Sequence, residues 1–473
     1  MKGQIKALPI LLSCLVSSPL WAEESLDQLL EGFDAEPVSA QPAESGNGEL
    51  DDLMGGFDEP SSESSGERSS SSQPKNWELS GALSLQGEYG YAHDAPLSGA
   101  DYRGLSHLRT SLNLGLDYRF SPTWRGYLSG HINYDAGYLL NGRSHYSSTL
   151  LDAEESELEI DEARLQGQLS SNVDLTIGRQ IVVWGKSDNL TVTNLLNPID
   201  NRAPGMVDIK DLRLPLTMAK LDYYVGDWGF SAIVIPEIRF NKIPTQGSEF
   251  YPYPMAQPAE IVPDDGGSNS ELAFAANGRF SGWDLSLYHA QLYDDNPYQT
   301  MVGMTPVLKH SRIKMSGVAA NWVTGSWLLK GEVALLDDLH YSGVSPSYNR
   351  ADLLVGAEYN GIISTSLSAE LVERTIRDHD AVLSGVGVAK VSRQLALSAK
   401  RDFNHDRFHL MGLVLLNDWK LGSGGIVRVS GEYELNDALA LTVGVVDYLS
   451  ADSLPYSAVA DNDRLFVRAE YSF

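Results

Sequence analysis

Apolar and polar residues alternate over many short stretches of the chain, and the last eleven residues show this pattern clearly. Apolar side chains occupy every second position there, namely Leu465, Val467, Ala469, Tyr471 and Phe473. The positions between them are mostly polar: Arg464, Phe466, Arg468, Glu470 and Ser472. Because successive side chains of a β-strand point to opposite faces, the stretch predicts a strand with one apolar and one polar face.

The same alternation follows residue 76 in three consecutive stretches. The apolar sets are Trp77, Leu79, Leu83, Leu85, Tyr89 and Tyr91, then Thr110, Leu112, Leu114, Leu116, Tyr118 and Phe120, then Trp124, Leu128, Ile132 and Tyr134. Aromatic residues stand near the strand ends, where a bilayer interface would lie. After the first 22 residues, no stretch approaches eighteen uninterrupted apolar residues, so we predict no membrane-spanning helix.

The connections between the predicted strands alternate strictly between short and long. Tight turns are expected at Ser121–Thr123, Ser170–Asn172, Gly226–Asp227, Ser281–Gly282, Thr324–Gly325, Asn360–Gly361, Asn404–Asp406 and Asn436–Asp437. Longer connections fall around 92–107, 135–156, 182–216, 236–270, 293–310, 337–349, 376–391, 417–425 and 447–462. Eight short against nine long connections predict an all-β fold, a transmembrane antiparallel β-barrel of about 18 strands (16–20) over residues 75–473.

The closing stretch resembles the last strand of Gram-negative outer-membrane barrels, which the outer-membrane insertion machinery recognises. On this resemblance Tyr471 and Phe473 are the insertion signal. The alternative is an edge strand of a soluble β-sandwich, but a sandwich gives no reason for alternating short and long connections.

Composition narrows the possible functions. The net charge is −28, which argues against nucleic-acid binding as the main activity. The mean hydropathy of −0.20 is too polar for a helical membrane protein but suits a barrel with half-polar strands. The one cysteine, Cys14, lies in the predicted leader, so disulfides, cysteine-ligated zinc and thiol catalysis are excluded from the mature chain.

Residues 1–22 have the form of a signal peptide. Lys2 and Lys6 form a basic start, residues 10–16 an apolar centre, and Leu20-Trp21-Ala22 a cleavage site. The stretch around Cys14 resembles a lipoprotein box only faintly, because Leu12 fits that motif poorly. The sequence therefore predicts export.

Residues 23–74 are acidic and rich in Ser, Pro and Gly, with fourteen acidic residues against one basic residue, Arg68. Such a segment buries too little apolar area to fold alone, so we predict a disordered periplasmic tail. It holds two copies of L-D-x-L-Φ-x-G-F-D, where Φ is a large apolar residue, at 26–34 and 50–58. We interpret them as docking motifs anchored by Leu29, Phe33, Leu53 and Phe57, the alternative being chance similarity within a low-complexity tail.

Charged residues on the polar strand faces should point into the barrel, because each would cost about 2–4 kcal/mol facing lipid at mid-depth. Lumen wall charges are therefore expected at Arg109, Arg119, Arg125, Arg312 and Arg428. They could form a lattice of wall salt bridges or a charged constriction that selects solutes, and both interpretations stay open.

The connection at 182–216 is preceded by Gly178-Arg179-Gln180 and contains Trp184-Gly185-Lys186-Ser187. A phosphate-binding loop would need glycine at position 180, so we reject a nucleotide site. Aliphatic residues mixed with charges predict a loop that folds into the lumen. Its constriction residues would be Trp184, Lys186, Asp188, Asn197, Asp200 and Arg202. The alternative is an extracellular hairpin that packs on itself.

Residues 178–215 resemble a proteobacterial family of porin-like outer-membrane β-barrels of unassigned function. The shared features are G-R-Q-x-x-x-W-G, an N-P-x-D segment at 197–200, and Leu212-Arg213-Leu214-Pro215 at the end. Members are often encoded beside RND-superfamily transporters. The resemblance implies export or surface delivery of a small or lipidic solute with an RND-type partner, and gives no catalytic residues.

We expect no enzyme activity, cofactor or metal. The histidines are scattered, no G-x-S-x-G motif occurs, and paired loop aspartates are explained by solvation. The expected partners are outer-membrane lipids, the insertion machinery and an RND-type transporter bound through 26–34 and 50–58. An outer-membrane channel or export conduit is the main hypothesis. A plugged structural or receptor barrel is the alternative, and a barrel-embedded hydrolase the weakest.

Overall fold

The computed structural model describes residues 76–93, 100–207, 212–253, 255–419, 422–452 and 456–473. The predicted signal peptide (1–22) and acidic tail (23–74) lie outside these residues, and so do Leu29, Phe33, Leu53 and Phe57. Residues 76–473 form one compact unit. No helix among the described residues is long and apolar enough to cross a membrane.

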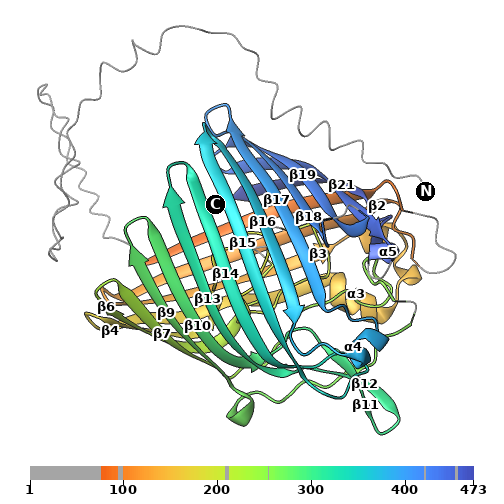
Figure 1. The fold of residues 1–473 in the computed structure, drawn as a ribbon. Helices are drawn as coiled ribbons and strands as arrows, with labels where there is room; N and C mark the ends of the chain where they lie inside the picture. Colours follow the sequence, from red (N-terminus) through yellow and green to blue (C-terminus); the bar gives the residue numbers. More distant parts are fainter. Residues whose placement is uncertain (1–75, 94–99, 208–211, 254, 420–421, 453–455) are drawn as a thin grey trace, which may run out of the picture. The chain divides into compact units, whose positions relative to one another are not determined.

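Eighteen strands form a single sheet (Figure 1). In chain order they are β1 (Trp77–Gly90), β2 (Gly104–Ser121), β3 (Trp124–Asp135), β4 (Ser156–Ser170), β5 (Val173–Gln180), β6 (Leu216–Val225), β7 (Trp228–Ile235), β9 (Glu271–Phe280), β10 (Trp283–Tyr293), β13 (Arg312–Thr324), β14 (Trp327–Leu339), β15 (Tyr348–Ile362), β16 (Thr365–Ile376), β17 (Val391–Phe403), β18 (Phe408–Leu416), β19 (Ser423–Asn436), β20 (Leu439–Ala451) and β21 (Arg464–Ser472). Each pairs antiparallel with the next of this series.

The sheet closes because β1 pairs with β21 as well as with β2. The closing register brings Leu83 opposite Tyr471, and Gly81 exchanges two backbone hydrogen bonds of 2.9 Å with Phe473. Closure removes the free edges that an open sheet would expose. The predicted antiparallel barrel of about 18 strands is confirmed.

Short turns join the strands at one end of the barrel and long connections at the other, as predicted. The two ends are called here the short-turn end and the long-loop end. One turn differs from its predicted place: β15 continues through Asn360 and Gly361, and the chain turns at Ile363 and Ser364. A register shift between Tyr359 and Ile362 accommodates the additional residues.

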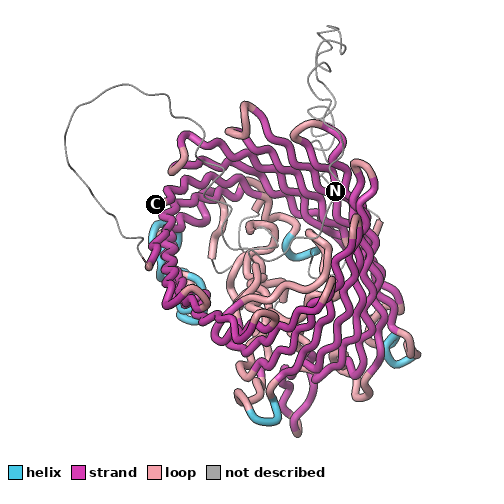
Figure 2. Tube along the Cα trace, turned by 90° about the vertical axis from the view of Figure 1, so that its left-hand side faces the viewer, coloured by secondary structure: helices cyan, strands magenta, loops and turns pink. Residues whose placement is uncertain are grey.

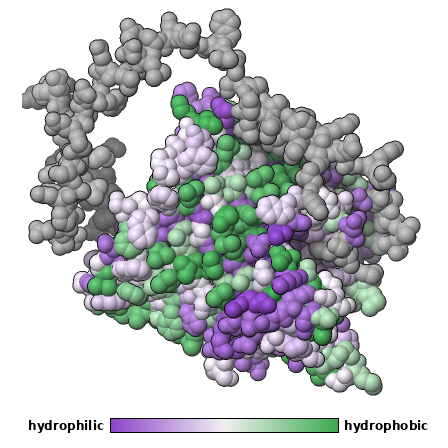
Figure 3. Space-filling model, viewed as in Figure 1, coloured by the Kyte–Doolittle hydropathy of each residue, from purple (hydrophilic) through white to green (hydrophobic). Residues whose placement is uncertain are grey.

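The two faces of the wall differ in chemistry, and adjacent residues show it directly. Leu83 is 47% exposed on the outside, whereas the side chain of Ser84 next to it points inward and is buried. Likewise Leu465 is exposed outward, and Arg464 is buried inside. Figure 3 shows apolar side chains over the strands and polar side chains over the loops below them. An apolar outer band of this kind belongs to a barrel that spans a membrane.

The remaining elements are short and lie in the long connections. They are the helices α2 (Gly137–Leu140), η2 (Arg143–His145), α3 (Ser148–Glu154), η4 (Gly267–Asn269), α4 (Ala381–Gly385) and α5 (Tyr456–Val459), and the small sheet of β8 (Ala259–Glu260), β11 (Tyr298–Val302) and β12 (Thr305–Lys309). Figure 2 shows that several connecting segments lie within the ring of strands. The longest connections, 181–215 and 236–270, supply the interior contacts described next.

Candidate functional site: the 181–215 loop inside the barrel

The loop leaves the wall at the end of β5, where Gly-Arg-Gln fixes the exit. Gly178 has φ +122°, and a Cβ there would lie 2.1 Å from the carbonyl oxygen of Ala163 on β4. Only glycine allows this approach of two backbones. Gln180 is buried and its side-chain amide donates to the carbonyl of Met218 on β6. The chain therefore turns inward from a rigid position.

Trp184 and Gly185 make the first contact with a more distant part of the wall, on β10. The indole of Trp184 stacks on Tyr288 of β10 with 4.6 Å between ring centroids. Gly185 has φ +83°, and its N–H donates to the Tyr288 hydroxyl at 3.2 Å. The positive φ of Gly185 turns the following N–H groups toward the wall.

Glu332 of β14 receives these N–H groups. Its Oε1 accepts from the backbone N–H of Lys186 at 2.6 Å and of Ser187 at 2.9 Å. Its Oε2 accepts from the N–H of Thr193 at 3.1 Å and from the Thr193 hydroxyl at 2.7 Å. One buried wall carboxylate thus fixes both ends of the 186–193 turn.

Glu370 of β16 acts in the same way on the middle of the turn. It accepts from the backbone N–H groups of Asp188, Asn189 and Leu190 at 2.8–3.0 Å. Consecutive N–H groups directed at an anion form the kind of nest that binds phosphate in other proteins. Here the anions are two carboxylates of the same chain, which explains why the sequence resembles a phosphate loop without being one.

Asparagine side chains hold the rest of the loop together. Asn197 accepts from the N–H of Val182 at 2.8 Å and donates to the carbonyl of Leu214 at 2.9 Å. Asn194 accepts from the N–H of Trp184 at 3.1 Å. The outgoing and returning arms are therefore joined at the wall, and the N-P-x-D segment begins at this junction.

Apolar packing also fixes the loop against the wall. Trp184, Leu190, Val192 and Leu196 are buried against inward side chains of β6 to β17. The wall members include Met218, Ile233, Ile235, Ala273, Ile313, Met315, Leu336, Leu354 and Val372. Burying one side chain of the size of leucine contributes about 1.5–3 kcal/mol. The loop and this half of the inner wall therefore share one hydrophobic core.

The six residues predicted for the constriction fall into two groups. Lys186 contacts Asp284 of β10 at 2.6 Å, Asp188 pairs with Lys330 of β14, and Trp184 lies beside them. Asp200 and Arg202 form an ion pair near β4, where Arg202 also contacts Glu157 at 2.9 Å. Asn197 lies at the base of the loop. Their role as a constriction remains a prediction.

A cavity of about 470 Å³ lies between the loop and the inner faces of β1 to β4. Its wall side carries charges, among them Arg109, His131 and Glu159, while the loop side is mostly apolar. Lys242 of the 236–270 connection reaches in and contacts Glu157 at 2.5 Å and Glu159 at 2.6 Å. The sequence did not predict this cavity, because its residues come from six segments of the chain.

Two clusters have the geometry of metal ligands, but cations of the chain already occupy them. Glu88, His107 and Glu249 converge, and so do His131, Glu157 and Glu159. Arg464 contacts Glu88 and Glu249, and Lys242 contacts Glu157 and Glu159. Burial alone would raise the pKa of Glu249, but Arg464 and His107 hold it below its usual range. The clusters are therefore neutralised from within the protein.

Four predicted wall charges, Arg109, Arg119, Arg125 and Arg428, stand on the inward side of their strands. The prediction for Arg312 is wrong. Arg312 pairs with Tyr293 on the outward side of the wall, and its guanidinium donates to the carbonyls of Asn269 and Ser270. On β13 the inward positions Ile313 and Met315 are apolar because the loop packs on them.

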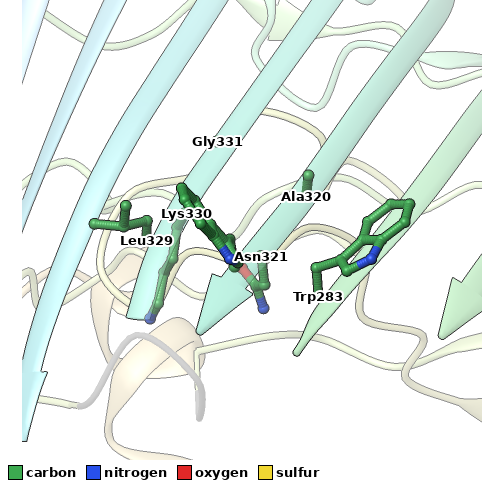
Figure 4. A pocket seen from close by; sticks show the side chains of 7 residues that line it. Trp283, Ala320, Asn321, Leu329, Lys330 and Gly331 are labelled. Atoms are coloured by element: carbon green, nitrogen blue, oxygen red, sulfur yellow. The ribbon is translucent and has the colours of Figure 1, made fainter. Parts of the chain in front are cut away.

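Two further features lie on the outer face. A hollow of about 530 Å³ lies beside Trp283, and the small residues Ala320 and Gly331 also line it. Figure 4 shows where these residues lie. On neighbouring strands His289 Nδ1 lies 3.0 Å from Ser316 Oγ. Within the described part of the chain, no carboxylate contacts the other ring nitrogen of His289.

The chain is similar to several solved structures. Among solved structures, OpdK of Pseudomonas aeruginosa matches 84% of this chain and 99% of its own at 14% identity, with a TM-score of 0.48. OccK5 (OpdH) of the same organism matches 84% and 98% at 10% identity and TM-score 0.48. OmpT of Vibrio cholerae, lacking loop L8, matches 84% and 99% at 11% identity and TM-score 0.37.

No curated protein matches the chain. The family model described as "Protein of unknown function (DUF1302)" matches residues 105–473, which include all strands after β1 and the whole inner loop. The chain therefore belongs to the DUF1302 family.

Proposed function

We propose that this protein is an outer-membrane channel or export conduit whose lumen the 181–215 loop narrows. A single-chain antiparallel barrel with an even number of strands is the form in which bacterial outer-membrane proteins span the bilayer. A barrel of eighteen strands is wide enough to enclose water beside an inserted loop. The observation that carries the proposal is the charged inner wall next to a loop fixed in one place.

The inner charges favour a polar path over a closed core. Arg350 and Arg374 contact Asp352 at 2.8 and 3.5 Å on the inner wall of β15 and β16. Such ion pairs would have a large desolvation free energy in a dry interior. They suit a water-filled lumen, where they can also orient charged solutes. The proposed cargo is a small or lipidic solute.

A second candidate function is a plugged receptor or structural barrel. The loop's apolar core and its seven hydrogen bonds to Glu332 and Glu370 favour it, because a loop held so firmly could block the lumen permanently. A surface ligand would then bind the long connections. No contact of the described residues favours a hydrolase over these two.

Electrical recordings in planar lipid bilayers separate the two functions. A channel gives steady openings whose size scales with salt concentration, and a plugged barrel stays silent. Heat-modifiable migration on gels must show in parallel that the inserted protein is a folded barrel. Folded protein that never conducts would contradict the channel and support the receptor.

The proposed partner is an inner-membrane transporter of the RND type, reached through the acidic tail in the periplasm. The tail precedes β1, which begins at the short-turn end, and short turns face the periplasm in outer-membrane barrels. Two copies of one apolar motif suit bivalent docking, since the second contact becomes intramolecular and avidity can rise by roughly 10²–10⁴.

Replacing Phe33 or Phe57 alone with Ala should weaken capture of the transporter modestly, and replacing both should abolish it. Each aromatic side chain would anchor one motif, while nearby aspartates steer the encounter. Site-specific cross-linking in the periplasm measures capture. Barrel insertion should be the same in all three variants. If deletion of 23–74 leaves both cross-linking and transport intact, the tail is only a spacer.

A further inference from the structure

Strand pairing in the wall is incomplete between β4 and β5. β4 spans Ser156–Ser170, but β5 pairs only with its residues 163–170. Residues 156–160 pair with β3 on one edge, and no strand among the described residues pairs with their other edge. There a side chain takes the place of a strand: Arg179 Nε donates to the carbonyl of Ile160 at 3.0 Å. The wall therefore has a gap on the β5 side of residues 156–162.

Ion pairs close this gap where a backbone ladder would be expected. Arg179 contacts Glu159 at 3.1 Å and Glu237 at 2.5 Å, and Arg239 contacts Glu159 at 2.5 Å. These contacts join side chains, so they can separate without breaking the backbone pairing between β3 and β4. The closure is consequently weaker than the wall on either side.

The outer side of the gap faces the bilayer. Leu158 and Ile160 point outward from the unpaired stretch and are 80% and 56% exposed. Leu158 pairs with Ile132 of β3. Two residues further along β3, Tyr134 also faces outward, and it is an aromatic residue of the kind found at membrane interfaces. The gap therefore opens at the edge of the apolar band, beside acyl chains.

The inner side of the gap is the 470 Å³ cavity, and both edges of the gap line it. Glu157, Glu159 and Asp161 line it from β4, and Ile181 and Leu214 from the ends of the loop. Its volume is within the range of small-molecule sites, about 300–1,000 Å³. One face is charged and the other apolar, the apolar residues being Ile181, Ala203, Val207, Leu212, Leu214, Pro215 and Phe250.

We propose that this cavity binds a bilayer amphiphile, an apolar chain with a zwitterionic or cationic head, which enters sideways through the gap. The chain would lie on the apolar loop side and the head on the wall side. The lining carries charges of both signs, eight carboxylates and four lysine or arginine side chains, so a head that carries a positive charge fits it better than an anionic one. The inference rests on the proposed conduit function and names its cargo class.

The test uses single cysteines in the mature chain, which otherwise has none. Asn133→Cys places a bimane label in the cavity, at a side chain that forms no hydrogen bond with any other described residue. Ile132→Cys on the same strand faces outward and is the positive control. Asn277→Cys lies on the inner wall in a different hollow of the lumen and is the negative control. Brominated acyl chains of phosphatidylcholine vesicles quench any label they touch.

We expect quenching at position 133 close to that at 132 and several-fold above that at 277. Brominated phosphatidylglycerol, with an anionic head, should quench 132 equally but 133 much less. Quenching at 133 no greater than at 277 would overturn the site, and equal quenching by both lipids would overturn the assigned head group. Folding is verified by heat-modifiable migration of each labelled variant.

The outcome is separable from that of the channel proposal. A barrel that conducts ions but shows no lipid quenching at 133 overturns only the amphiphile site. A barrel that is quenched at 133 but never conducts keeps the site and overturns the channel.

Discussion

Replacing Glu332 and Glu370 together with alanine should raise single-channel conductance and open-channel noise. The two carboxylates accept seven hydrogen bonds from residues 186–193. A hydrogen bond to a charged group contributes about 1.5–3 kcal/mol, and the N–H groups left behind would be buried without acceptors. The turn should therefore leave the wall, while Trp184 and Leu196 keep the base of the loop in place. Planar-bilayer recordings measure the change.

Glu432→Gln is the matched control for this double variant. Glu432 is also an inward carboxylate of the wall, on β19, but its hydrogen bond is to Thr442 of the neighbouring strand. Its replacement should leave conductance and noise at the wild-type level. If the double alanine variant has the same conductance and noise as this control, the two carboxylates do not fix the loop in a position that limits ion conductance.

Removing Phe473, or replacing it with aspartate, should lower the amount of folded barrel in the membrane several-fold. The Phe473 backbone closes the β1–β21 seam through two hydrogen bonds to Gly81, and its ring packs where a Cβ on Gly81 would be 2.6 Å away. A charge at this outward position would face lipid or its interface, at a cost of up to about 2–4 kcal/mol. The heat-modifiable fraction after membrane fractionation measures the loss.

Ser472→Asp serves as the comparison for position 473. Ser472 is its neighbour but belongs to the inward face of β21, with Glu470 and Arg468. A charge there enters the aqueous lumen and should leave insertion nearly unchanged. Equal losses at 472 and 473 would mean that the effect does not depend on the outward aromatic side chain.

The sequence predicted the architecture well because a barrel wall depends on local rules. The alternation from Leu465 to Phe473 follows from the two-residue period of a strand. The alternation of short and long connections follows from a closed antiparallel ring that spans a membrane. The shifted turn at Ile363–Ser364 shows the limit of turn signals. Asn360-Gly361 is a strong turn sequence, yet the strand extends past it. A register shift between Tyr359 and Ile362 accommodates the extension at the short-turn end.

The wrong prediction that Arg312 faces the lumen has a more general cause. The prediction assumed that every charged strand face borders the lumen. On β13 that assumption fails, since Ile313 and Met315 face inward and pack on the loop. The aliphatic residues Val192 and Leu196 of the loop were a signal that part of the inner wall must be apolar as well.

The contacts that fix the loop could not be predicted in detail. Glu332 and Glu370 were recognisable as inward carboxylates, but their hydrogen-bond donors are backbone N–H groups more than 130 residues away. The same holds for the cavity, where Lys242 joins Glu157 and Glu159 across the interior. Such pairings depend on how long connections fold, which residue periodicity does not encode.

Replacing residues 190–205 with a short Gly-Ser linker tests the central claim most directly, because it removes the inner loop from a conducting barrel. The control deletes the tip of the β11–β12 hairpin, residues 300–305, at the long-loop end. Single-channel conductance and ion selectivity are measured in planar bilayers. We predict a larger conductance with altered selectivity for the loop variant and wild-type values for the hairpin variant. Unchanged conductance and selectivity in the loop variant would contradict the claim that this loop narrows a channel.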